Sequence, residues 1–283
     1  MFIFALKSLL LICVSILLIA CDGFQATNIS GMCDEKPAIC EDFHQIGDCR
    51  FLRTSVIRAR YQLEMVSNEK NTIKALEELD AYKSCLELTL QIAYTRYKDR
   101  KQKRLDNYLA SKKVIDQLLV KSVGTQDPNL AYFLWTNHND LAAKQVFLNA
   151  TNQPNISDIS LLTKLAIYHT ADEPQRAIQF FYDALQKTDN IEALPTGIFI
   201  QIIGLFYSHH LYQEAYIWSI VATETNQDNA PINIEKIVTK GYFSKQLQSE
   251  LTNISEHYIE ALEQGSFSQP APSLFKPLSL DVD

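Results

Sequence analysis

Apolar residues recur at helical spacing in two neighbouring segments near the start of the chain. From Cys49 to Val66 they step by three or four residues, which places them on one face of a helix. A turn signal at Ser67 follows, and then a second helical pattern with apolar positions on two faces. The pattern predicts an antiparallel hairpin over about 49–66 and 71–97, with a second helix that is packed on both sides.

Three later segments share one form: an aromatic-containing apolar stretch, a polar break, and a second apolar stretch with an early alanine. The alanines are Ala142, Ala177 and Ala215. This form resembles tetratricopeptide-type repeats, whose usual period is about 34 residues, and the resemblance implies stacked pairs of short helices. An irregular helical bundle stays open as the alternative, because three imperfect copies are close to the minimum for a repeat array.

These patterns together predict an all-α protein, and 8 Gly and 9 Pro among 283 residues agree with helix over sheet. We expect an N-terminal, disulfide-stapled helical hairpin followed by a TPR-like α-solenoid of about three helix pairs. The expected limits are a signal peptide at 1–20, a lipidated Cys-containing linker at 21–48, the hairpin at 49–123, the repeat region at 124–264 and a disordered tail at 265–283.

The first twenty residues have the layout of a secretory signal: an early positive charge at Lys7, an apolar run, and small residues before Cys21. The run is short for a retained membrane anchor helix, which is the alternative. Leu18-Ile19-Ala20-Cys21 resembles the lipobox of bacterial lipoproteins. The resemblance implies that Cys21 becomes the N-terminus and carries lipid, including palmitate-type acyl chains, which hold the protein to a membrane.

Asp22 follows the cysteine that the lipobox resemblance marks for lipid. An Asp at this position resembles the signal that retains lipoproteins in the inner membrane of enteric bacteria. We therefore expect a protein of the cell envelope, anchored in the inner membrane and facing the periplasm. The outer membrane stays open, because the rule differs between bacteria and depends on the next residue, here Gly23.

Four further cysteines remain in what would be an oxidising compartment, where disulfides persist. Cys49 and Cys85 lie equally far from the predicted turn at Ser67, so an antiparallel hairpin brings them to the same height. We predict the pairs Cys49–Cys85 and Cys33–Cys40. A zinc site is the alternative; the absence of C-x-x-C spacing argues against it, and no metal ligand is assigned.

Two sets of residues are candidates for contact with a partner. The first is the basic stretch within an acidic chain: Arg96, Lys98, Arg100, Lys101, Lys103 and Arg104. The alternative is that this stretch is a solvated turn of a helix with no binding role. The sequence leaves open whether the helix continues through it or breaks. The second set is aromatic, because aromatic residues dominate binding hot spots, with core packing as the alternative: Trp135, Tyr212 and Trp218, together with Tyr132, Tyr168 and Tyr207.

Charge and motifs exclude several functions. A formal net charge of -7 gives no electrostatic reason for nucleic-acid binding. The sequence lacks a nucleophile elbow, a zinc-protease helix motif and a phosphate-binding glycine loop, so we assign no catalytic residue and no cofactor. His210 and Glu214 share a helical face, but two ligands are fewer than a metal site needs.

The lipobox, the cysteine-rich start and the helical remainder together resemble an uncharacterised family of lipoproteins from Gram-negative bacteria, a resemblance that implies no activity. We interpret the chain as a membrane-anchored periplasmic interaction module that binds an envelope protein or peptide through a helical-repeat surface. The alternatives are an envelope enzyme acting on the cell wall and a carrier of a small apolar ligand.

Overall fold

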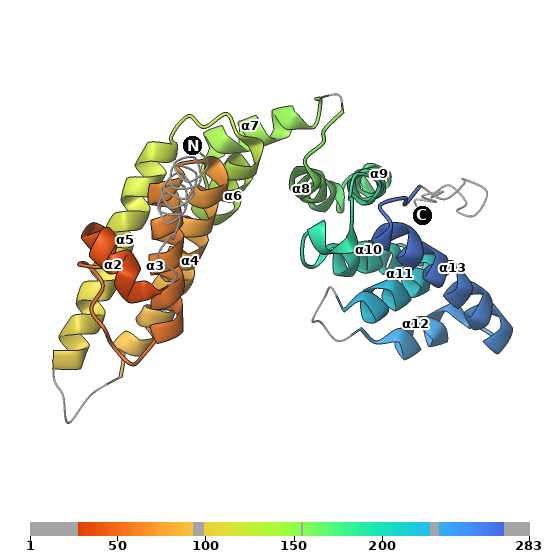
Figure 1. The fold of residues 1–283 in the computed structure, drawn as a ribbon. Coiled ribbons are helices and arrows are strands. Elements are labelled where there is room, and N and C mark those ends of the chain that lie inside the picture. Colours follow the sequence, from red (N-terminus) through yellow and green to blue (C-terminus); the bar gives the residue numbers. More distant parts are fainter. Residues whose placement is uncertain (1–27, 93–98, 154, 227–231, 269–283) are drawn as a thin grey trace, which may run out of the picture. The chain divides into compact units, whose positions relative to one another are not determined.

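The computed structural model describes residues 28–92, 99–153, 155–226 and 232–268. Within these ranges the chain forms twelve α-helices and no strand, which confirms the predicted all-α class (Figure 1). None of the described helices is long and apolar enough to cross a membrane. The chain divides into two compact units, Met1–Asp140 (unit 1) and Leu141–Asp283 (unit 2).

Unit 1 contains the predicted helical hairpin. Its elements are α2 (Ile29–Glu35), a 3-10 turn (Pro37–Ile39), α3 (Arg50–Met65), α4 (Glu69–Leu90), α5 (Asp99–Ser122) and α6 (Pro128–His138). The central helix is α4, which contacts α3, α5 and α6. This arrangement confirms that the second helix of the hairpin is packed on more than one side.

Side-chain caps begin two of these helices where the sequence carries turn signals. Asn68 accepts a hydrogen bond from the Asn71 N–H at 2.8 Å and caps α4. Asp127 accepts one from the Leu130 N–H at 2.7 Å and caps α6. Each cap satisfies a backbone donor that has no partner inside its helix, which explains why the helices begin there.

Both predicted disulfides are confirmed. Cys33 bonds to Cys40, with their Cα atoms 5.6 Å apart. Cys49, the residue before α3, bonds to Cys85 in α4, with their Cα atoms 6.1 Å apart. The equal distances of Cys49 and Cys85 from the turn therefore do bring the two thiols together across the hairpin.

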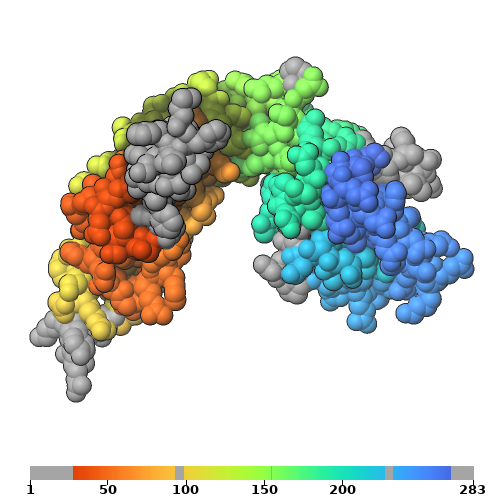
Figure 2. All heavy atoms as spheres, in the orientation of Figure 1, coloured from red at the N-terminus to blue at the C-terminus, as the bar shows by residue number. Residues whose placement is uncertain are grey.

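The chain before Cys49, predicted as a linker, is folded in its described part. Met32, Ile39 and Phe43 are buried, and Met32 and Ile39 form a small apolar cluster with residues of α3. In Figure 2 the red atoms of α2 lie directly against the orange atoms of α3. Only three apolar side chains of this described segment are buried, which explains why no apolar periodicity marks it.

Unit 2 is a succession of packed helix pairs. Its elements are α7 (Leu141–Ala150), α8 (Ile159–His169), α9 (Pro174–Gln186), a 3-10 turn (Ile191–Ala193), α10 (Ile198–Ser208), α11 (Tyr212–Thr225), α12 (Ile234–Gly241) and α13 (Lys245–Glu263). Helix α8 packs on α9 and α10 on α11, and α11 also contacts α12 and α13. These consecutive contacts fit a solenoid, as the sequence predicted.

The first predicted repeat differs from the other two. Its two helices, α6 and α7, fall in different compact units, because the boundary lies between Asp140 and Leu141. Ala142, the predicted small residue, is exposed, and the neighbouring Ala143 is buried instead. In the other two pairs Ala177 and Ala215 are fully buried where the sequence predicted close approach of helices.

A cluster of aromatic rings forms the centre of unit 2. Trp218 is fully buried, with the rings of Phe199, Tyr258 and Phe267 all within 6 Å of its own, centroid to centroid (5.8, 5.4 and 5.9 Å). Phe267 belongs to the predicted disordered tail, yet its side chain is buried in this cluster. The chain reaches it through a turn at Gly265, whose φ of 62° suits glycine.

Candidate functional site

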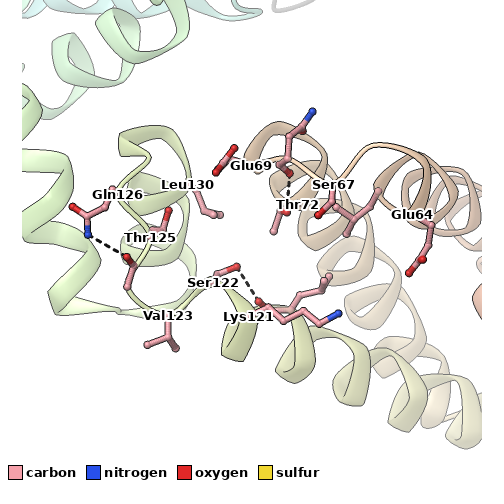
Figure 3. Close-up of a pocket in the computed structure, with 14 residues that line it drawn as sticks. Glu64, Ser67, Glu69, Thr72, Lys121, Ser122, Val123, Thr125, Gln126 and Leu130 are labelled. Carbon is pink, nitrogen blue, oxygen red and sulfur yellow. Dashed lines mark hydrogen bonds between the residues drawn. The ribbon is translucent and has the colours of Figure 1, made fainter.

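Unit 1 contains an open pocket of about 520 Å³. Figure 3 shows that two turns of the chain flank it, the α3–α4 turn on one side and the α5–α6 turn on the other. Its lining residues are Leu63, Glu64, Ser67, Asn68, Glu69, Thr72, Leu118, Lys121, Ser122, Val123, Gly124, Thr125, Gln126 and Leu130.

Local capping interactions shape the pocket wall. The Thr72 hydroxyl donates to the Asn68 carbonyl at 2.8 Å, and the Ser122 hydroxyl donates to the Leu118 carbonyl at 2.9 Å. Gly124, with a φ of 77°, turns the chain sharply after α5. The helix ends beside the pocket therefore carry local side-chain hydrogen bonds, and Glu64, Ser67, Glu69 and Lys121 are exposed.

The lining carries charges of both signs. Glu64 and Glu69 contribute carboxylates and Lys121 contributes an ammonium group, and all three residues are exposed. Carboxylates outnumber the cation, so the pocket favours a ligand group with a positive charge. A second, smaller hollow of about 240 Å³ lies between α3 and α4 and also contains both charge signs, through Arg58, Lys74 and Glu78.

The predicted basic contact stretch is only partly a surface. Arg96 and Lys98 lie outside the described residues, whereas Arg100 and Lys101 are exposed at the start of α5. Lys103 forms an ion pair with Asp99 at 3.0 Å within the same helix. From Asp99 onward the stretch is therefore helical and its first residues are solvated.

Arg104 is fully buried, so its assignment to a contact surface was wrong. Its guanidinium forms an ion pair with Asp48, and its Nη1 donates to the Thr89 carbonyl at 2.8 Å. The physical reason is the phase of the helix. Because α5 is helical from Asp99 onward, residue 104 falls on the face that packs against α4.

Asn107, one turn later on the same face, is a structural residue that the sequence reasoning missed. Its Nδ2 donates to the His44 carbonyl and to the Tyr82 hydroxyl, both at 2.9 Å, and its Oδ1 accepts from the His44 N–H at 2.7 Å. Burial raises the pKa of Tyr82 to about 12. The spacing of Arg104, Asn107 and Ser111 along one helix face was the signal that would have identified them.

The aromatic candidates separate into core and half-buried residues. Trp218 belongs to the core of unit 2, so the prediction that it contacts a partner was wrong. Tyr212 is half-buried and lies edge-on to Tyr207, with ring centroids 5.5 Å apart. Trp135, in unit 1, is also half-buried and lies edge-on to Tyr132 at 6.1 Å. Tyr168 is half-buried as well, so partly accessible aromatic candidates remain in both units.

The described residues contain no group of three or more His, Cys, Asp or Glu side chains that could hold a metal ion. His210 is exposed in the turn before α11, and its Nδ1 lies 2.9 Å from the Tyr212 hydroxyl. Glu214 is half-buried, and burial raises its pKa. His210 precedes α11, so it does not share a helical face with Glu214 as the sequence predicted.

Fold and cysteine pairing define an all-helical, disulfide-bonded protein with a solenoid-like second unit. The chain belongs to a family described as "Protein of unknown function (DUF2989)", whose model matches residues 18–220. No curated protein matches the chain. No solved structure matches it either. Cys21 and Asp22 lie within the matched range but outside the described residues, so lipid attachment and sorting stay predictions.

Proposed function

We propose that this protein is a lipid-anchored lipoprotein of the bacterial envelope that binds a protein or peptide partner through unit 1. The observation that carries the proposal is the open pocket between the α3–α4 and α5–α6 turns. Its volume of about 520 Å³ accommodates a few residues of an extended peptide, within the usual range of ligand pockets.

The chemistry of the lining supports a peptide over a small apolar ligand. Glu64 and Glu69 suit a lysine or arginine side chain of the partner, and Lys121 suits an acidic one. Leu63 and Leu130 supply apolar contact beside them. A segment with net positive charge and one apolar residue matches this combination, whereas a carrier of apolar molecules needs an enclosed apolar cavity.

The state of the cysteines supports an envelope location. Cys33, Cys40, Cys49 and Cys85 are all disulfide-bonded, as is usual for proteins that fold in an oxidising compartment. The proposal places the protein on the periplasmic side of the inner membrane, with lipid on Cys21. It rests there on the lipobox-like sequence and on Asp22. The second unit adds a TPR-like surface, where Tyr207 and Tyr212 are candidate contacts.

Site-specific photo-crosslinking in cells tests the binding proposal. The full-length protein carries a photoreactive amino acid at Thr72 or Gln126, on opposite sides of the pocket, or at Tyr242 as a control. Tyr242 is 92% exposed and belongs to unit 2. We expect the same partner to be crosslinked from both pocket positions and not from Tyr242.

A charge reversal at the pocket sharpens this experiment. Glu69→Lys is expected to reduce the crosslinked product severalfold, whereas Glu256→Lys, an exposed reversal on α13, leaves it unchanged. No shared product from Thr72 and Gln126 would contradict the binding proposal. For the anchor, Cys21→Ser is expected to abolish lipid attachment, measured by mass spectrometry of the N-terminal peptide; an unchanged, unmodified N-terminus in the natural protein contradicts it.

A further inference from the structure

Helix α5 has an exposed face that carries aliphatic side chains along most of its length. The face that packs into unit 1 consists of Arg104, Asn107, Ser111, Val114, Ile115, Leu118 and Ser122. On the opposite face the exposed aliphatic residues form two pairs. Leu105 and Leu109 lie near the start, and Val120 lies at the end together with Val123, the residue that follows the helix. Leu109 is 52% exposed and Val120 is 73% exposed, so nothing in the described chain covers this face.

Charged residues separate the two aliphatic pairs. Lys112 and Asp116 are exposed between them, one helical turn apart on the same face. Neither side chain forms a hydrogen bond or an ion pair within the described ranges, although the side chains of many other charged residues of unit 1 do. Along the helix, this face therefore presents two aliphatic residues, then a cation, then an anion, and then two aliphatic residues.

When two copies of this face are placed antiparallel, aliphatic residues meet aliphatic residues and the cation of each copy meets the anion of the other. We propose that α5 packs antiparallel against α5 of a second copy of this chain, around a two-fold axis near residue 114. Leu105 then faces Val123 of the second copy, and Leu109 lies beside its Val120. Lys112 faces Asp116 of the second copy, and symmetry forms this ion pair twice.

The central charges decide between a second copy and a membrane surface. A helix that lies on a bilayer keeps its charged side chains on the polar side of an uninterrupted apolar face. Here Asp116 lies in the middle of the apolar stripe, where a lipid surface leaves its charge without a partner. A second copy supplies Lys112 as that partner. The charged contacts of the proposed dimer, Lys112 and Asp116, lie outside the pocket proposed to bind a peptide, whereas Val123 also lines that pocket.

Charge-swap variants of the full-length protein, extracted in detergent, test the arrangement by light scattering coupled to size-exclusion chromatography. Lys112→Asp and Asp116→Lys each oppose like charges at both symmetric contacts, and each is expected to weaken dimerisation by about tenfold or more. The double variant restores the pairs in reverse and is expected to dimerise. The two single variants, when mixed, are expected to form a mixed dimer.

Matched controls separate this effect from a general change in charge. Lys70→Asp and Glu87→Lys make the same charge reversals at exposed positions of α4. We expect both variants to keep the molecular mass of a dimer in light scattering. Circular dichroism checks that every variant keeps its helix content. In cells, Lys113→Cys, close to the two-fold axis, is expected to give a covalent dimer on a non-reducing gel, whereas Lys70→Cys does not.

Three results overturn the proposal. The first is a monomeric natural protein at all concentrations. The second is a dimer that persists in both single charge variants. The third is a Leu109→Lys variant that stays dimeric. If the natural protein is monomeric and the Leu109→Lys variant loses binding to anionic phospholipid vesicles, the face is a membrane surface.

Discussion

The two units differ in the contacts that hold their segments in place. In unit 1 one disulfide closes a loop inside the cysteine-containing segment, and the other joins the start of α3 to α4. Buried polar contacts attach the segment to α3 and α5. Arg53 donates to the Phe43 carbonyl at 2.9 Å and Arg60 donates to the Ile39 carbonyl at 2.7 Å, so helix side chains bind the backbone of that segment. In unit 2 one continuous apolar core of aromatic and aliphatic side chains holds the helices together.

The difference shows what each kind of contact specifies. A hydrogen bond to a backbone carbonyl fixes the position of a segment that buries little apolar area, because its geometry is narrow. An apolar core supplies more stabilisation but is non-directional, because it depends on the apolar area removed from water. The Tyr258 hydroxyl is buried in unit 2 without a hydrogen-bond partner among the described residues. Removing single contacts from each unit tests this contrast.

The largest effect is expected for the long-range disulfide. Replacing Cys49 and Cys85 by Ala opens a crosslink between residues 36 apart in sequence and is expected to lower the free energy of unfolding of unit 1 by about 4 kcal/mol. Urea unfolding gives the magnitude, and hydrogen exchange by mass spectrometry assigns it to unit 1. Replacing Cys33 and Cys40, only 7 apart, is the matched comparison, with an expected loss of about 2.5 kcal/mol. Equal losses contradict the loop-length argument.

Arg104→Ala is expected to destabilise unit 1 by about 3 kcal/mol, because Asp48 and the Thr89 carbonyl lose a buried charged donor. Arg104→Lys is expected to recover less than half of this loss, since an ammonium group lacks the planar fork of donors. Lys101→Ala, at an exposed position of the same helix, is the control and is expected to change stability little. The same urea unfolding measurement applies; a neutral Arg104→Ala variant contradicts the structural role.

Phe267→Ala is expected to destabilise unit 2 by about 2–3 kcal/mol, because a buried ring leaves a cavity beside Trp218 and Tyr258. Faster hydrogen exchange is expected in α13 and not in unit 1. Ser268→Ala, at the exposed next residue, is the control. If Phe267→Ala changes neither stability nor exchange, the end of the chain does not contribute to the core.

The smallest effect concerns pH. Burial lowers the pKa of His169, although Glu173 lies 3.4 Å from its Nδ1, so the folded state binds the proton less well than the unfolded state. Its contribution to stability is therefore complete above the ordinary pKa of histidine, near about 6.5, and is lost as pH falls through the lowered value. His169→Phe, which keeps the ring stacked on Phe180, is expected to flatten this loss in melting curves between pH 7 and pH 5. An unchanged pH dependence contradicts the assignment.

Properties that depend on positions along the chain were predictable. The helical class followed from apolar spacing, and the pairing of Cys49 with Cys85 followed from equal distances to one turn. Both depend only on positions along the sequence. The helical period and the number of residues between each cysteine and the turn determine them, without knowledge of any other element. The family of the chain adds no activity to this picture.

Tertiary structure decided the remainder. Arg104 is buried and Lys101 is exposed in the same charged stretch, because the phase of α5 against α4 determines which side chain meets Asp48. Phe267 is buried only because the turn at Gly265 directs it into rings supplied by distant helices. The pocket requires two turns, far apart in sequence, to lie side by side. Burial is a property of what surrounds a residue, and those surroundings come from parts of the chain that no local pattern specifies.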